Sequence, residues 1–149
     1  MTLLLDAFYV YLTDQKVREI KLKKRIEKKF GIPGDKAHPI SWIVTLLRTP
    51  VDDYRKNAIG LILAPYLINI KKLPYDNAST IIRDWLKKCS QLRSLDPNFD
   101  YRIKYSLNSA IRKLQLPIRF STLERKNKGM HRILSDNMQG LSNDLKRLR

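Results

Sequence analysis

Arg55 and Lys56 are the two cations of this chain whose position most directly suggests chemistry. They follow Asp52 and Asp53, two candidate N-caps of a helix that is almost wholly apolar from Ala58 onward. Cations are disfavoured at a helix N-terminus by the macrodipole, whereas the free N–H groups there bind anions. A phosphate ligand would supply the missing negative charge, so the pair predicts a phosphate site. The alternative is that both side chains point into water.

A second group of residues combines aromatic, amide and cationic side chains on one expected helix, Phe99–Leu114. Phosphates are bound by Arg and Lys, while bases stack on flat aromatic rings and pair their edges with amides. This mixture predicts a nucleotide or single-strand platform, with half-buried packing of the tyrosines as the alternative. The platform consists of residues spaced i, i+4, i+7 and i+11 with two flanking cations: Tyr101, Tyr105, Asn108 and Arg112, with Arg102 and Lys104 beside them.

Asn69, Lys71 and Lys72 close the apolar central helix at its C-terminus. The macrodipole favours cations there, which is a sufficient structural reason for the two lysines. We nevertheless include Asn69 and Lys71 among the candidate nucleotide- or template-binding residues.

Catalytic and metal-binding arrangements are not evident in the sequence. Asp52 and Asp53 are adjacent and diverge at a helix start, whereas metal-dependent phosphoryl transfer needs convergent carboxylates. His38 and His131 have no evident partners, and a single Cys89 can hold neither a disulfide framework nor a cysteine-ligated cluster. No P-loop or dinucleotide fingerprint is present. We therefore expect no catalytic residue, no metal and no cofactor in this chain.

The charge balance points to a polyanionic partner. Thirty Lys and Arg against fourteen Asp and Glu give a formal net charge of +16 and a pI near 10.1. A basic surface that is merely solvated is the alternative, but such surfaces usually balance Lys with Glu. The lone cysteine suggests a reducing compartment. The apolar stretch Leu3–Leu12 is interrupted by Asp6 and too short to span a membrane. We expect a cytoplasmic protein without membrane contact.

These residues must be positioned by helices, because glycine is scarce and the apolar residues recur at helical spacing. The expected fold is an all-α compact helical bundle over residues 39–149, preceded by a basic segment over residues 1–35 that is either a solvated helix or a mobile arm. In that segment, Leu3–Leu12 is expected to be a helix or short strand, and Thr13 and Asp14 to cap the basic run that follows. Pro65 lies inside the central helix and predicts a kink or local unwinding.

Two further helix starts are expected in the bundle, at Asn77 and at a capping box formed by Ser121 and Glu124. The helix after Asn77 is expected to bury Trp85. Leucine-spaced residues then continue from Leu134 to Leu148.

Three strings in the middle of the chain carry a family resemblance: YRKNAIGLILAPYLINIKKL, then IIRDWLKKC, then DYRIKYSL. Over residues 53–107 the sequence resembles PriX, the small non-catalytic subunit of archaeal primases. It is also similar to the helix-bundle domain of archaeal plasmid primase-polymerases. The family is related to the C-terminal domain of the primase large subunit without its iron–sulfur cluster, and the lone Cys89 agrees with that.

The resemblance implies a heterotrimer with the catalytic and large primase subunits. It also implies binding of the initiating nucleotide triphosphate and of single-stranded DNA template during primer initiation in DNA replication. Arg55 and Lys56 would meet the triphosphate. The nucleotide or template would be contacted by residues of the string DYRIKYSL: Tyr101, Arg102, Lys104 and Tyr105.

Two other classes of protein remain open. A helix-turn-helix DNA-binding regulator would also be small, helical and basic, although the candidate helix presents tyrosines and lacks a preceding glycine turn. An architectural adaptor would instead use the leucine-spaced C-terminal segment.

Overall fold

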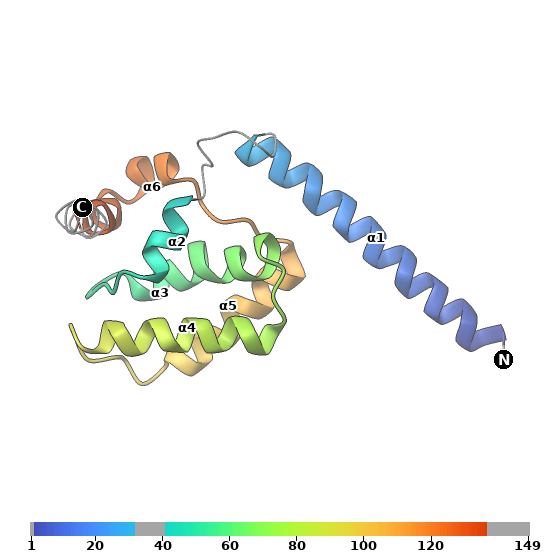
Figure 1. Cartoon of the computed structure of the whole chain (residues 1–149), viewed down its shortest axis with the longest axis horizontal. Coiled ribbons are helices and arrows are strands. Elements are labelled where there is room, and N and C mark those ends of the chain that lie inside the picture. Colours follow the sequence, from blue (N-terminus) through green and yellow to red (C-terminus); the bar gives the residue numbers. More distant parts are fainter. Residues whose placement is uncertain (1, 32–40, 137–149) are drawn as a thin grey trace, which may run out of the picture. The chain divides into compact units, whose positions relative to one another are not determined.

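The computed structural model of the protein describes residues 2–31 and 41–136 (Figure 1). All regular elements in these two ranges are helices, which confirms the all-α class. The chain divides into two compact units, residues 1–38 and residues 39–149. His38, most of the breaker at 31–35 and the leucine-spaced segment beyond residue 136 lie outside the described residues.

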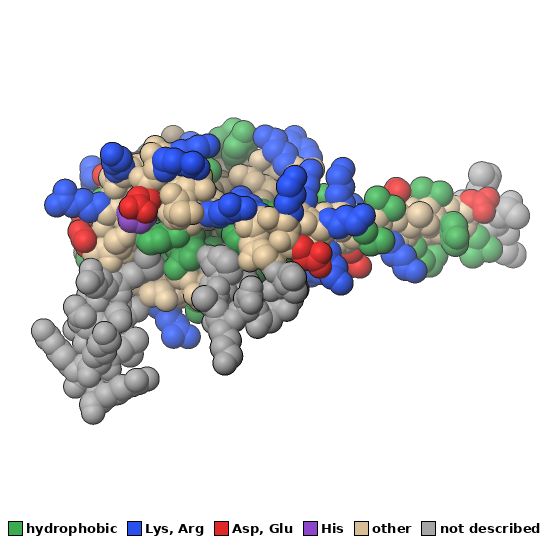
Figure 2. Space-filling view, turned by 90° about the horizontal axis from the view of Figure 1, so that it is seen from above, with side chains coloured by type: hydrophobic (Ala, Val, Ile, Leu, Met, Phe, Trp, Pro, Cys, Tyr) green, Lys and Arg blue, Asp and Glu red, His purple; other side chains and the backbone are tan. Residues whose placement is uncertain are grey.

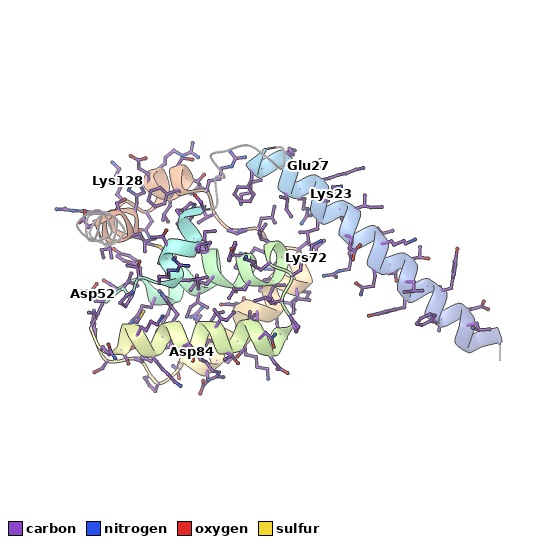
Figure 3. The ribbon with its side chains drawn as sticks, in the orientation of Figure 1. Lys23, Glu27, Asp52, Lys72, Asp84 and Lys128 are labelled. Carbon is purple, nitrogen blue, oxygen red and sulfur yellow. The ribbon has the colours of Figure 1, made fainter. Side chains whose placement is uncertain are left out.

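The first unit contains α1, a single helix of 29 residues spanning Thr2–Phe30. The expected cap at Thr13 and Asp14 is wrong, because the helix runs through both residues. Thr13 Oγ1 donates to the carbonyl of Tyr9, one turn earlier, at 2.9 Å, so the hydroxyl is satisfied within the helix. Straight-chain helix formers then dominate, with Lys23 and Glu27 one turn apart (Figure 3).

The buried centre of the second unit is a continuous run of helix from Arg55 to Ile70. It begins as α3 (Arg55–Ala58), widens into the π-helical segment η1 (Ile59–Leu63), and ends in a second π-helical segment, η2 (Tyr66–Ile70). Pro65 lies between the two π-helical segments, so the expected local unwinding is confirmed.

Pro65 also explains how the next loop attaches to this central run. Proline has no N–H, so carbonyls one turn before it are available to other donors. The carbonyl of Leu61 accepts from the Ile118 N–H at 3.0 Å, and that of Gly60 accepts from Gln115 Nε2 at 3.4 Å. The chain leaving α5 is thereby hydrogen-bonded to the centre of the bundle.

Four further helical segments surround the central run: α2 (Ser41–Leu47), α4 (Tyr75–Ser90), α5 (Phe99–Lys113) and α6 (Phe120–Lys126), the last followed by a helix over residues 128–136. α2 and α5 pack on η1, and α4 packs on α5 and η2. Trp85 is buried as expected, and its indole N–H donates to the carbonyls of Leu46 and Thr49 at 3.0 and 3.2 Å. The largest fully buried side chains of this core include Ile43, Leu46, Ile59, Ile62, Leu63, Leu67, Ile82, Trp85, Ile103, Leu107, Leu123 and Met130.

The helix starts differ from the expected caps. Tyr54, not Asp52 or Asp53, precedes α3, and it does so in the left-handed conformation with φ of 59°. α4 starts after Pro74 rather than at Asn77, and the Pro74 carbonyl accepts the first hydrogen bond of the helix, from the Ala78 N–H at 3.0 Å. α6 starts after Arg119, which places Ser121 inside the helix and removes the capping box.

Candidate nucleic-acid interface

The outer surface of α5 brings five of the predicted site residues together. Tyr101 and Tyr105, one turn apart, are 68% and 49% exposed, and their rings stack with centroids 6.2 Å apart. They border an open hollow of about 570 Å³. We call this surface the tyrosine face, and it is lined by Tyr101, Lys104, Tyr105, Asn108 and Arg112.

The helix register produces the tyrosine face. Phe99, Ile103, Leu107 and Ala110 turn inward and are buried, so residues offset from them by about half a turn must face outward. The lining includes two cations and no carboxylate. Arg102 is half-buried and does not line the hollow, although sequence reasoning placed it with the others.

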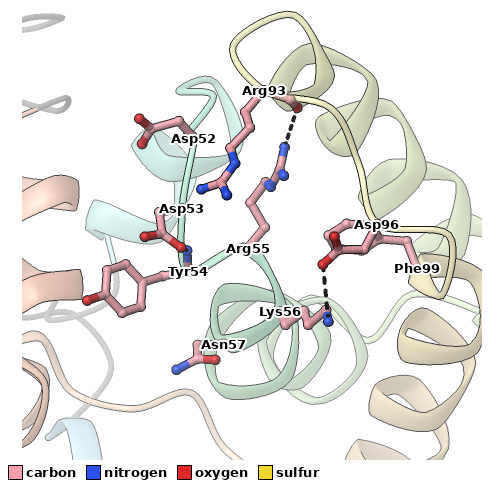
Figure 4. Close-up of a pocket in the computed structure, with 9 residues that line it drawn as sticks. All are labelled: Asp52, Asp53, Tyr54, Arg55, Lys56, Asn57, Arg93, Asp96 and Phe99. Atoms are coloured by element: carbon pink, nitrogen blue, oxygen red, sulfur yellow. Dashed lines mark hydrogen bonds and ion pairs between the residues drawn. The ribbon is translucent and has the colours of Figure 1, made fainter.

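A second candidate surface lies at the start of the central run. We call it the loop pocket. It is a cavity of about 290 Å³ between the residues that begin α3 and the loop that joins α4 to α5 (Figure 4). Its lining residues are Asp52, Asp53, Tyr54, Arg55, Lys56, Asn57, Arg93, Asp96 and Phe99.

Arg55 borders the loop pocket, but its guanidinium is already bonded to backbone carbonyls. The side chain is only 7% exposed. Nη1 donates to the carbonyls of Arg93 at 2.7 Å and Cys89 at 3.4 Å, and Nη2 donates to that of Ser94 at 2.8 Å. The guanidinium carbon also lies 5.6 Å from the centroid of the Phe99 ring.

These contacts explain why a cation is tolerated at the N-terminus of α3. The carbonyls of Cys89, Arg93 and Ser94 lie at and just beyond the C-terminus of α4, where the macrodipole is negative. The favourable interaction of the Arg55 charge with the C-terminus of α4 therefore offsets its unfavourable interaction with the N-terminus of α3. The unfavourable placement that suggested a phosphate ligand has a structural explanation.

Lys56 is the more accessible of the two predicted cations. Its Nζ lies 3.2 Å from Asp96 Oδ2, and both side chains are well exposed. An ion pair of this kind contributes little to stability and is readily exchanged for another partner. Exposed Arg93 is the third cation of the lining, after Arg55 and Lys56, but Asp52, Asp53 and Asp96 add three carboxylates that balance them. The loop pocket is thus far less cationic than the protein as a whole.

Tyr54 forms one wall of the loop pocket. Asp53 Oδ1 accepts its backbone N–H at 2.7 Å, so this aspartate holds the turn before α3 rather than capping the helix. The Tyr54 phenol lies against Gly129, where an added Cβ would collide with the hydroxyl oxygen. Glycine at position 129 therefore permits this close approach.

Asn69 and Lys71, at the other end of the central run, do not join either surface. Asn69 is 3% exposed, and its Nδ2 donates to the carbonyls of Ala110 and Gln115 at 3.0 and 2.5 Å. The amide thereby ties η2 to the C-terminus of α5. Lys71 is exposed at the end of η2, and Lys72 follows in a left-handed turn before α4 (Figure 3).

Among the loop-pocket residues that sequence reasoning did not assign to a site, Arg93 and Asp96 are the two charged ones beyond the start of α3. They lie in the loop between α4 and α5, where no helical spacing relates them to Lys56. In the sequence, this loop is indicated only by Asp96-Pro97, a pair of residues that favours a turn.

Metal-binding geometry is absent from the part of the chain that the structure describes: no three His, Cys, Asp or Glu side chains converge there. Cys89 is buried and accepts a hydrogen bond from the Val51 N–H at 3.4 Å. Burial raises the pKa of the Cys89 thiol, against smaller opposing effects of that hydrogen bond and of the Arg55 charge. Among the described helices, none is long and apolar enough to cross a bilayer.

The chain was compared with the sequence models of known protein families. The family model described as PriX, Primase X, matches residues 40–138, which cover most of the second unit. A search of curated proteins found no significant match.

Proposed function

Because the chain belongs to the Primase X family, we propose that it is a non-catalytic DNA primase subunit that binds the initiating nucleotide triphosphate and single-stranded template. A primase-related role follows from the family. The ligands, the absence of catalysis and the assembly with catalytic and large primase subunits in a cytoplasmic heterotrimer are our proposal.

The tyrosine face is the observation that carries this proposal. Exposed, mutually stacked tyrosines beside Lys104 and Arg112 offer what a single strand requires, namely a surface for stacking and cations for the phosphates. Asn108 lies in the same lining and can pair with base edges. We therefore assign template or nucleotide bases to Tyr101 and Tyr105, and backbone phosphates to Lys104 and Arg112.

We assign the triphosphate to the loop pocket, but the roles of its cations differ from those that the sequence suggested. Lys56 reaches phosphate by leaving Asp96, and Arg93 supplies a second cation. Arg55 acts as a positioning residue, because its bonds to three carbonyls hold the loop that carries Arg93 and Asp96.

Titration of single-stranded DNA into tyrosine variants tests the proposal. Tyr101→Ala and Tyr105→Ala are each expected to weaken binding by about 1–3 kcal/mol, since one base loses its stacking partner. The slope of log affinity against log salt should change little in these variants, because no charge is removed. Fluorescence anisotropy at several salt concentrations measures both quantities.

Tyr101→Phe and Tyr105→Phe are the matched controls, because phenylalanine keeps the ring and loses only the hydroxyl. They should bind like the unaltered protein. If the alanine variants bind as well as the phenylalanine variants, the tyrosine face is not the binding surface. With purified catalytic and large subunits added, the unaltered chain should stimulate formation of the first dinucleotide, and the alanine variants should stimulate it less.

A further inference from the structure

The N-terminal half of α1 exposes an unusual number of large apolar side chains. Between residues 5 and 12 there are six, and they are 45–73% exposed: Leu5, Phe8, Tyr9, Val10, Tyr11 and Leu12. Figure 2 shows hydrophobic side chains at several places along the surface of α1 that it draws. A contiguous apolar surface of this kind is rare on a soluble protein unless something binds it.

These side chains surround the helix rather than form a stripe. Phe8 to Leu12 are five consecutive residues, and successive side chains on an α-helix are separated by about 100°, so the five cover the full circumference. Within residues 5–12 the one charged side chain is Asp6, which lies near the start of the stretch. A partner must therefore contact this segment on more than one side.

The charges of α1 are divided between its two halves. Residues 1–15 contain Asp6 and Asp14 and no Lys or Arg, whereas residues 16–30 contain eight Lys or Arg and two Glu. The apolar segment is thus bordered by carboxylates at both ends. A polyanion would be attracted to the second half and repelled from the first.

We propose that the segment Leu5–Asp14 is a docking helix that inserts into an apolar groove of another primase subunit, and that Lys and Arg residues edge this groove. The identity of the partner rests on the proposed function, whereas the docking surface rests on α1. A groove contacts an inserted helix on several sides, as the distribution of Phe8–Leu12 requires. Cations at its rim would pair with Asp6 and Asp14.

A second copy of α1 and a membrane surface fit these features less well. Helix pairing covers a single stripe and would leave much of the apolar circumference in water. An interfacial membrane helix needs one polar face, usually rich in Lys or Arg, and this segment carries two aspartates instead. Both are nevertheless outcomes that the experiment distinguishes.

The test compares two double variants of the full-length chain. Phe8→Glu/Val10→Glu places carboxylates on opposite sides of the proposed docking segment. Val17→Glu/Ile20→Glu makes the same chemical change at two apolar positions that are each 57% exposed on the basic half of α1. All four positions are exposed, so both variants should retain the helical circular dichroism of the unaltered protein.

Affinity for purified catalytic and large primase subunits is measured by calorimetry. The Phe8→Glu/Val10→Glu variant should bind at least about tenfold more weakly, as expected for loss of central apolar contacts. The control should bind like the unaltered chain. Asp6→Lys/Asp14→Lys should also weaken assembly, and this loss should diminish at high salt.

Several results would overturn the inference. One is equal binding of the two glutamate variants to the primase subunits. Another is light scattering that shows a dimer abolished by Phe8→Glu/Val10→Glu, with binding to primase subunits unchanged. A third is binding to phosphatidylglycerol vesicles that the same variant abolishes while assembly is retained. Failure of the proposed function is recognised separately, because it shows as unaltered single-strand binding in Tyr101→Ala and Tyr105→Ala.

Discussion

At the scale of single residues, Arg55 illustrates how one position can have two physical explanations. Its place at a helix start suggests an anion ligand, because the macrodipole disfavours a cation there. In the fold, its hydrogen bonds are accepted instead by backbone carbonyls of residues 34 to 39 positions later in the chain. The neighbouring Lys56 has only an exposed ion pair with Asp96 and is the residue available to a ligand.

Replacing Arg55 should therefore destabilise the protein, unlike the removal of a side chain that points into water, which was the alternative left open by the sequence. Arg55→Ala is expected to lower the free energy of unfolding by roughly 2–4 kcal/mol, since buried carbonyls lose a charged donor. Arg55→Lys should recover only part of this, because an ammonium cannot reproduce the guanidinium fork. Urea denaturation followed by circular dichroism measures the difference.

Lys56→Ala is the control for this measurement. Removal of its exposed ion pair should change the free energy of unfolding by less than about 1 kcal/mol. Equal stabilities of the Arg55→Ala and Lys56→Ala variants would show that the carbonyl contacts of Arg55 contribute nothing.

At the scale of elements, the central run ends in a turn whose backbone is strained. Lys71 closes η2 with φ of −76°, and Lys72 follows with φ of 56° in the left-handed region. A side chain with a Cβ is disfavoured there, whereas glycine is not. Both lysines are exposed, so their side chains contribute little packing.

Replacement of these two adjacent lysines by glycine should therefore change the free energy of unfolding in opposite directions. Lys72→Gly is expected to raise the free energy of unfolding by about 0.5–1 kcal/mol, because it relieves the left-handed strain. Lys71→Gly is expected to lower it by about 1 kcal/mol, because the backbone there is helical. Thermal unfolding of both variants provides the measurement, and a loss of stability in Lys72→Gly would contradict the strained turn.

At the scale of the whole molecule, the net charge of +16 is unevenly distributed. The basic half of α1 and the tyrosine face concentrate cations, whereas the loop pocket and the apolar half of α1 contain carboxylates. If only the net charge mattered, every exposed lysine would contribute equally to the binding of a polyanion. The distribution instead predicts that particular lysines contribute to single-strand binding and that others do not.

Salt dependence distinguishes these lysines. Each neutralised phosphate of a single strand contributes about −0.7 to the slope of log affinity against log salt. Lys23→Gln/Lys24→Gln should reduce the magnitude of the slope by up to about 1.4, since both lysines are exposed on the basic half of α1. Lys87→Gln/Lys88→Gln removes the same charge from exposed positions of α4 and should leave the slope nearly unchanged. Equal effects of the two variants would indicate that only net charge matters.

Local periodicity was enough to predict the helical class and the burial of Trp85, and the proline at position 65 was enough to predict the local unwinding. Periodicity also placed Tyr101, Tyr105, Asn108 and Arg112 on one face, because residues three, four and seven apart on a helix necessarily lie together. Capping residues were less predictable. Thr13, Asn77 and Ser121 have suitable side chains, but the helices begin earlier, because a potential cap is used only where the chain actually turns.

Only the tertiary structure decided the partners of Arg55 and Asn69. Both side chains bond to carbonyls more than 30 residues away, so no periodic pattern relates donor to acceptor. The loop pocket depends in the same way on Arg93 and Asp96, which a loop brings to the start of α3. Sequence spacing determines which residues share a helix face. Which buried polar groups satisfy one another is determined by how the helices pack, since a donor in the interior must find whatever acceptor the fold places beside it.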